Sequence, residues 1–190
     1  IYLIPRPDPD GTETFSDAIF AYDPASGSWN RIPIPLSELK IDGSPVLEKA
    51  ADLTACVKDG KLMLLLTGVN NYGQSRVLLA SMDTDGSFEA LGANDGYCRM
   101  PAMGTLASDG SAFYLAGGAT AKNSEDENKQ VSNLIWKMAV DDSKQIIAVP
   151  AAKMTVPRLM PRVSCSNGTI LISGCHAPYS KGNPSIRPAE

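Results

Sequence analysis

Residues 53–66 read LTACVKDGKLMLLL, two apolar runs joined by Asp59-Gly60, and this pattern decides the fold class. Asp-Gly favours the positive φ angles of a two-residue hairpin turn, so we predict an antiparallel strand on each side of it. Residues 103–116, MGTLASDGSAFYLA, repeat the pattern around Asp109-Gly110. Residues 162–172, RVSCSNGTILI, repeat it around Asn167-Gly168. Three hairpins of one kind are therefore predicted.

A third and a fourth strand are predicted beside the hairpins, joined to each other by an acidic turn. The third strands are 18–22, 76–81 and 134–140, the turns begin at Asp23, Asp83 and Asp141, and strands restart at Trp29, Phe88 and Ile146. The hairpin glycines lie 50 and 58 residues apart, and the turn aspartates lie 60 and 58 residues apart. A repeat of this length with four strands per unit is the signature of propeller blades.

We therefore predict an all-β chain of about three consecutive four-stranded blades, forming part of a larger β-propeller. The blade boundaries are expected at roughly 1–48, 49–98, 99–153 and 154–190, within a single partial propeller domain spanning 1–190. Residues 1–4 match the second strand of a blade. Because propellers close with about 4 to 8 blades, the expected partner is the remainder of the propeller or a complementary chain.

Composition and charge narrow the classes of partner. The chain has 190 residues, of which 43% are hydrophobic and 20% charged, as in ordinary globular domains. Its net charge is −4 and no basic cluster is present, so we expect no nucleic-acid partner. The longest apolar run, 62–66, is far shorter than the roughly 20 residues that span a bilayer, so no membrane segment is predicted.

The single histidine and the cysteines form no metal-ligating or catalytic pattern. His176, the single histidine, lies beside Cys175, but a metal site needs three or four converging ligands and no CxxC or HxxxH spacing is present. We therefore expect no metal, cofactor or catalytic site within these residues. Of the cysteines, Cys98 leads into an inner strand and Cys175 leaves the second strand of the next blade. They form the candidate disulfide, with free thiols as the alternative.

The loops after the second strands are the expected binding face. Residues 5–17, 69–75, 119–133 and those from His176 onward are long and polar, and such loops should emerge on one face of a propeller. We expect a protein or carbohydrate ligand there. Trp29, Phe88 and Trp136 are interpreted as packing between blades rather than as sugar-stacking platforms.

One N-glycosylation sequon is free of proline. Asn167-Gly168-Thr169 lies at a predicted hairpin tip, where a glycan can be accommodated, and Asn167 is the candidate acceptor.

The sequence also resembles known proteins. The segments 21–24 (AYDP, followed by Trp29) and 115–118 (LAGG, after Asp109-Gly110) resemble the kelch blade pattern. Residues 50–188 are similar to the central blades of the glyoxal oxidase branch of the copper radical oxidases, relatives of galactose oxidase. This similarity is carried by Met154-x-x-Pro157-Arg158-x-Met160-Pro161, by 167–172, by Asn183-Pro184-x-x-Arg187-Pro188, by Arg99 with Pro101-Ala102-x-Gly104-Thr105, and by 75–79. Arg162, where the family has an acidic residue, and Met100, where an aromatic is common, depart from it.

The resemblance implies kelch-type blades and a copper chemistry that these residues do not contain. Family members hold copper with two tyrosines and two histidines, one tyrosine being linked to a cysteine, and they oxidise an aldehyde or primary alcohol with the release of hydrogen peroxide. With one histidine, the chain is expected to be a scaffold or binding segment without its own catalytic site. The alternatives are the central part of a secreted copper radical oxidase whose ligands lie outside these residues, and an intracellular kelch interaction adaptor. The resemblance and the Asn167 sequon favour a secreted protein.

Overall fold

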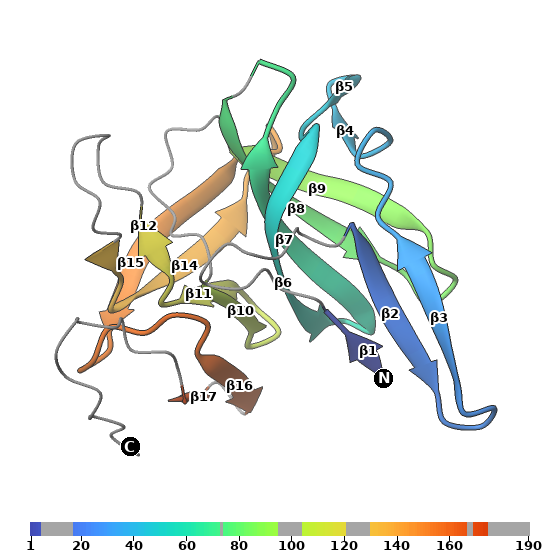
Figure 1. Cartoon of the computed structure of the whole chain (residues 1–190). Coiled ribbons are helices and arrows are strands. Elements are labelled where there is room, and N and C mark those ends of the chain that lie inside the picture. The colour runs from blue at the N-terminus through green and yellow to red at the C-terminus, as the bar shows by residue number, and fades with distance from the viewer. Residues whose placement is uncertain (5–16, 73, 95–103, 121–129, 167–168, 175–190) are drawn as a thin grey trace, which may run out of the picture. The chain divides into compact units, whose positions relative to one another are not determined.

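The computed structural model describes residues 1–4, 17–72, 74–94, 104–120, 130–166 and 169–174 (Figure 1). Every regular element in these ranges is a β-strand, and the strands pair antiparallel into sheets of two to four. No helix in the described ranges is long and apolar enough to cross a membrane. The predicted all-β class with four-stranded sheets is confirmed.

The chain divides into two compact units. The first unit contains residues 1–97 and 140–146, and the second contains 98–139 and 147–190. The first unit holds the three-stranded sheet β1-β2-β3, the ribbon β4-β5 and the four-stranded sheet β6-β7-β8-β9. Their bounds are β1 Tyr2–Leu3, β2 Ala18–Asp23, β3 Ser28–Pro33, β4 Lys40–Ile41, β5 Ser44–Pro45, β6 Lys49–Lys58, β7 Lys61–Val69, β8 Ser75–Met82 and β9 Phe88–Asn94.

The second unit holds the sheet β10-β11-β14-β15, apart from Val140 and Ile146, and the two-stranded sheets β12-β13 and β16-β17. Their bounds are β10 Thr105–Ser108, β11 Phe113–Ala116, β12 Ala119–Thr120, β13 Gln130–Val131, β14 Leu134–Val140, β15 Ile146–Lys153, β16 Arg162–Ser166 and β17 Thr169–Ser173. The connection from β11 to β14, expected as a loop over 119–133, thus contains the ribbon β12-β13.

The predicted hairpins and acidic turns are confirmed where the structure describes them. In the β6-β7 hairpin Lys58 pairs with Lys61, and Asp59 and Gly60 take φ angles of 52° and 77°, the two positive values that a type I′ turn requires. The β10-β11 and β16-β17 hairpins form as expected, although Asn167-Gly168 itself lies outside the described residues. The acidic turns lead from β2 to β3, from β8 to β9 and from β14 to β15.

The core of the first unit lies against the β6-β7-β8-β9 sheet. Leu62, Leu64 and Leu66 of β7 belong to one apolar cluster with Ile19 of β2 and with buried residues of the 34–47 segment. Alternate residues of a strand point to opposite faces of the sheet, and Met63 and Leu65 between these leucines are buried as well. The strand β7 is therefore apolar on both faces, as expected for a sheet that is covered on both sides.

In the second unit, the segment after β15 is held by main-chain hydrogen bonds around a buried arginine. Arg158 is 3% exposed and donates from Nη1 to the Gly174 carbonyl at 2.9 Å. Its backbone N–H donates to the Ser132 carbonyl at 3.1 Å, and its carbonyl accepts from the Gly118 N–H at 2.8 Å. The described part of the oxidase-like run, 154–161, thus has a structural role in holding these strands together.

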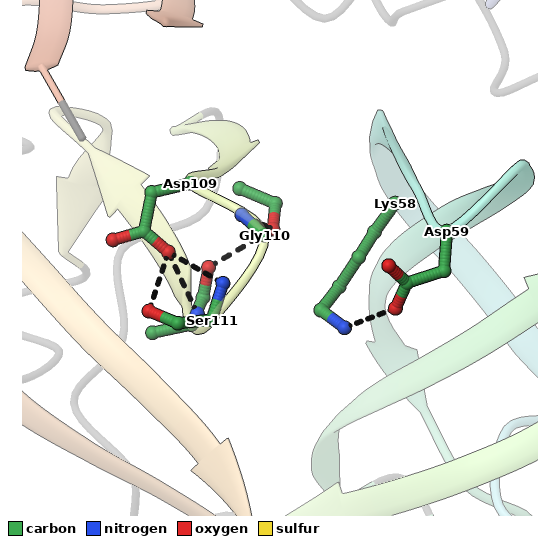
Figure 2. A network of polar contacts seen from close by, with 7 residues as sticks. Lys58, Asp59, Asp109, Gly110 and Ser111 are labelled. Atoms are coloured by element: carbon green, nitrogen blue, oxygen red, sulfur yellow. Dashed lines mark hydrogen bonds and ion pairs between the residues drawn. The ribbon is translucent and has the colours of Figure 1, made fainter. Parts of the chain in front are cut away.

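Aspartate side chains build the tight turns of both units. Figure 2 shows the Asp109 carboxylate facing the Ser111 side of its own turn, where it accepts from the N–H groups of Ser111 and Ala112, each at 2.8 Å. It also accepts from the Tyr114 hydroxyl at 2.9 Å. These hydrogen bonds, led by the Ala112 N–H, hold the pKa of Asp109 well below its ordinary value, and the bond to Asp109 raises the pKa of Tyr114. In the Asp-Gly turn between β6 and β7, Lys58 pairs with Asp59 (Figure 2).

The first prediction concerns the close approach at Gly117. Gly117 has φ +67°, and a Cβ placed on it would lie 2.3 Å from the Arg158 carbonyl oxygen. Gly110 has φ +90° but nothing within 4 Å of such a Cβ, so it is the matched control. We expect Gly110→Ala to lower the free energy of unfolding by about 1–2 kcal/mol through its φ angle alone. Gly117→Ala should cost at least about 2 kcal/mol more, measured by urea unfolding, and equal losses in the two variants would contradict the clash.

The second prediction concerns pH. Because the pKa of Asp109 is lowered in the folded state, its contribution to stability is fully present above the ordinary value of 3.8 and is lost as the pH falls through the folded-state pKa. Tyr114→Phe removes one donor and should raise the pKa of Asp109 toward 3.8, measured from the carboxyl ¹³C shift. Tyr22→Phe, on another sheet, is the control and should leave it unchanged. An unchanged Asp109 pKa in Tyr114→Phe would show that the hydroxyl bond does not form.

Candidate functional site

A groove of about 570 Å³, lined by both polar and apolar residues, lies in the first unit beside the connection from β7 to β8. Four separate stretches of chain line it: the segment that carries the β4-β5 ribbon, the β7-β8 loop with the start of β8, Ala93 of β9, and Gln145. In Figure 1 the β4-β5 ribbon and the β7-β8 loop project from the same end of the β6-β7-β8-β9 sheet. The lining residues are Ser37, Ile41, Asp42, Ser44, Pro45, Val46, Leu47, Glu48, Asn70, Asn71, Tyr72, Arg76, Ala93 and Gln145.

The β4-β5 ribbon presents Asp42 to the groove on a rigid turn. Ile41 pairs with Ser44, and Asp42 and Gly43 take φ angles of 51° and 81°, nearly the same as in the β6-β7 hairpin. The chain on either side is anchored because Leu39 and Leu47 are buried in the core cluster. The sequence contained the signal for this turn, the dipeptide Asp42-Gly43, but its flanks lack the apolar runs that mark the other hairpins.

The β7-β8 loop is built around the buried Asn70. The Asn70 Oδ1 accepts from the N–H groups of Tyr72 and Gln74, each at 3.0 Å, and its Nδ2 donates to the Gln74 Oε1 at 3.1 Å. The backbone N–H of Asn70 also donates to the Gln74 carbonyl at 3.0 Å. These bonds tie Asn70 to Tyr72 and Gln74, and Tyr72 is 80% exposed and lines the groove. The loop was predicted at 69–75 and is observed between Val69 and Ser75.

Gln145 reaches the groove because the acidic turn at Asp141 docks on β9. The Asp141 Oδ1 accepts from the Gln145 N–H at 2.9 Å, and the Lys144 carbonyl accepts from the Ala93 N–H at 2.9 Å. Ala93 and Gln145 form a parallel bridge. The approach needs Gly92, since a Cβ there would lie 2.7 Å from Cγ1 of Val140.

The groove offers both hydrogen-bond donors and acceptors. Asp42 and Glu48 supply carboxylates, and neither side chain bonds to another of the described residues. Arg76 supplies a guanidinium, whose Nη2 donates to the Gln74 Oε1 at 3.4 Å. Ser37 and Ser44 add hydroxyls, and Asn71 and Gln145 add amides, so the lining can pair with a polar ligand in several directions.

The site residues predicted from the sequence are not among the residues that the structure describes. Asn167, Cys98, Cys175 and His176 fall outside the described residues, so the glycosylation site and the disulfide remain predictions. Cys165, on β16, is a half-buried free thiol. Within the ranges that the structure describes, no three His, Cys, Asp or Glu side chains converge as a metal site would require.

The aromatic residues depart in part from the predicted packing. Phe88 packs against the core cluster as predicted. Trp29 is 56% exposed, so the expectation that it packs between blades is wrong in the described structure. It instead lies against Tyr22, with ring centroids 5.0 Å apart. The sequence did not mark Tyr72 as a site residue, because it lies in a polar loop without strand periodicity. The only local signal was the pair Asn70-Asn71 before it, which is typical of a turn.

Comparison with known proteins supports the fold. No protein-family model and no curated protein matches the sequence. A solved structure titled "Structure of YjhT", a kelch-type β-propeller protein, matches with a TM-score of 0.55 and 17% sequence identity. The match covers 85% of this chain and 46% of that structure, so the chain spans about half of its length. This likeness and the four-stranded antiparallel sheets show that the chain has a β-propeller-like scaffold.

The third prediction tests what holds the β7-β8 loop. Asn70→Ala removes the acceptor for the N–H groups of Tyr72 and Gln74, so hydrogen exchange of these two amides should accelerate about fivefold to tenfold. Asn71→Ala, the exposed neighbour, is the control and should leave both rates within about twofold. Equal exchange rates in the two variants would mean that Asn70 does not hold the loop.

Proposed function

We propose that this chain is a propeller-type scaffold that binds a ligand in the groove beside the β7-β8 loop and has no catalytic site of its own. The groove carries this proposal, because four segments distant in sequence form it and are held by hydrogen bonds and by the core. Its volume of about 570 Å³ lies within the roughly 300–1,000 Å³ typical of small-molecule sites. It also lies at one of the loops expected to form the binding face.

The ionisable groups around the groove favour recognition over catalysis. Among the described residues that line it, Asp42, Glu48, Tyr72 and Arg76 ionise. Asp42, Glu48 and Tyr72 are exposed to solvent, whereas acid–base catalysts are commonly tuned by burial and close neighbours. Their directional donors and acceptors suit the binding of a polar molecule.

The central part of a secreted copper radical oxidase is the second candidate, favoured by the resemblance over 154–188. In that case the copper ligands lie outside these residues, and the chain supplies blades that frame the copper site. Arg158 bonds to Gly174, Ser132 and Gly118 and so ties neighbouring strands together. Both the oxidase and the scaffold need this connection, so it favours neither. An intracellular kelch interaction adaptor is the third candidate function.

Peptide mapping of the natural protein under non-reducing conditions separates these three. Flanking peptides with a Tyr-His pair and a cysteine-linked tyrosine would favour the oxidase. A glycan on Asn167 and a Cys98–Cys175 linked peptide would favour a secreted protein. Reduced thiols, an unmodified Asn167 and an attached adaptor domain would favour the intracellular adaptor.

The fourth prediction tests binding itself. The ¹⁵N-labelled chain is titrated with a library of metabolites, saccharides and short peptides. Chemical-shift changes from a bound compound should cluster at Asn71, Tyr72 and Gln145, which line the groove. Ser44→Trp places a large ring on the groove wall and should weaken that binding about tenfold or more, because it fills the site.

The control is Thr84→Trp, which adds the same ring at an exposed position in the acidic turn after β8. It should leave the affinity unchanged. A library in which no compound shifts the groove residues, or equal affinity in Ser44→Trp, would contradict the proposed function.

A further inference from the structure

We infer that the ligand of this groove is a neutral carbohydrate whose ring stacks on Tyr72. The inference rests on the proposed function and names the class of ligand. Three features of the groove support it: a solvent-exposed aromatic side chain on a fixed backbone, a lining that mixes donors with acceptors, and a volume that suits one or a few sugar rings.

The first feature is the placement of Tyr72. It is 80% exposed, and its N–H is bonded to the Asn70 Oδ1 at 3.0 Å, while Asn70 also bonds to Gln74. Tyrosine combines an apolar ring face with a polar tip. A sugar ring likewise has an apolar C–H face and a polar rim of hydroxyls, so it can cover the exposed ring while its hydroxyls stay hydrogen-bonded.

The second feature is the chemistry of the lining. Carboxylates only accept hydrogen bonds, a guanidinium only donates, and amides and hydroxyls do both. A sugar hydroxyl donates and accepts at once, so it can pair with Asp42, with Arg76 or with Gln145. A polyanion would face the carboxylates of Asp42 and Glu48, and a polycation would face Arg76. A neutral polyol meets neither repulsion.

The third feature is the small size of the groove. A stable protein interface covers about 800 Å² on each partner and is centred on a buried apolar patch. The groove is instead small and concave, and its lining mixes polar with apolar residues. We therefore favour a carbohydrate over a peptide of a protein partner as the ligand.

The fifth prediction tests the ligand class on the full chain. The probes are neutral hexasaccharides of glucose, galactose, mannose, xylose and N-acetylglucosamine, with hexagalacturonate and hexalysine as charged comparisons. We expect at least one neutral probe to bind, shifting Asn71, Tyr72 and Gln145 in ¹⁵N spectra. Tyr72→Ala should weaken its binding about tenfold, because the stacking surface is lost. Tyr72→Phe keeps the ring and should stay within about threefold of the parent chain.

Tyr2→Ala is the matched control, because it removes an exposed tyrosine from β1, outside the groove. It should bind as the parent does, and the ¹⁵N spectra of all variants report whether each is folded. Binding of only hexalysine, hexagalacturonate or a library peptide in the groove would overturn the carbohydrate inference and leave the proposed function standing. Equal affinity in folded Tyr72→Ala would also overturn it. If neither these probes nor the earlier library shift the groove, both proposals fail.

Discussion

The β6-β7-β8-β9 sheet is apolar on both faces, and the rest of the first unit depends on this constraint. Five consecutive residues of β7, 62–66, are buried, although neighbouring residues of a strand face opposite sides. One face is covered by Ile19 of β2 and by the buried residues of the 34–47 segment. A sheet of this kind is stable only when layers lie on both sides of it, which is the arrangement that successive propeller blades provide.

The same covering segment also builds the groove. Leu39 and Leu47 are almost completely buried, at 2% and 1% exposure, and they fix the two ends of the chain that carries β4 and β5. Between them the ribbon turns tightly at Asp42-Gly43 and projects beyond the core. The position of the Asp42 carboxylate is therefore set by hydrophobic packing several residues away. The packing that stabilises this part of the unit thus also shapes the groove.

The local parts of this fold were predictable, and the contacts between distant segments were not. Asp59-Gly60 and Asp109-Gly110 predict their hairpins because turn chemistry and the flanking apolar runs agree. Asp42-Gly43 has the same turn chemistry, but its strands have only two residues each, too short to show a period. The bridge between Ala93 and Gln145 joins residues 52 positions apart and depends on the missing side chain at Gly92. No periodicity encodes such a contact, so the groove could not be located from the sequence.

Some aspartates of this chain stabilise turns, whereas Asp42 faces the groove, and the hydrogen bonds of each carboxylate show which of the two it does. The carboxylates of Asp23, Asp109 and Asp141 are occupied by backbone N–H groups within their own turns. A carboxylate used in this way stabilises its own turn, and the oxygen that accepts these bonds is less open to a ligand. Asp42 lies in a turn as well, but there the backbone conformation is supplied by Gly43 and by pairing of the strands. Its carboxylate makes no bond to the described residues and faces the groove, so this turn, unlike the others, leaves an acidic group available for recognition.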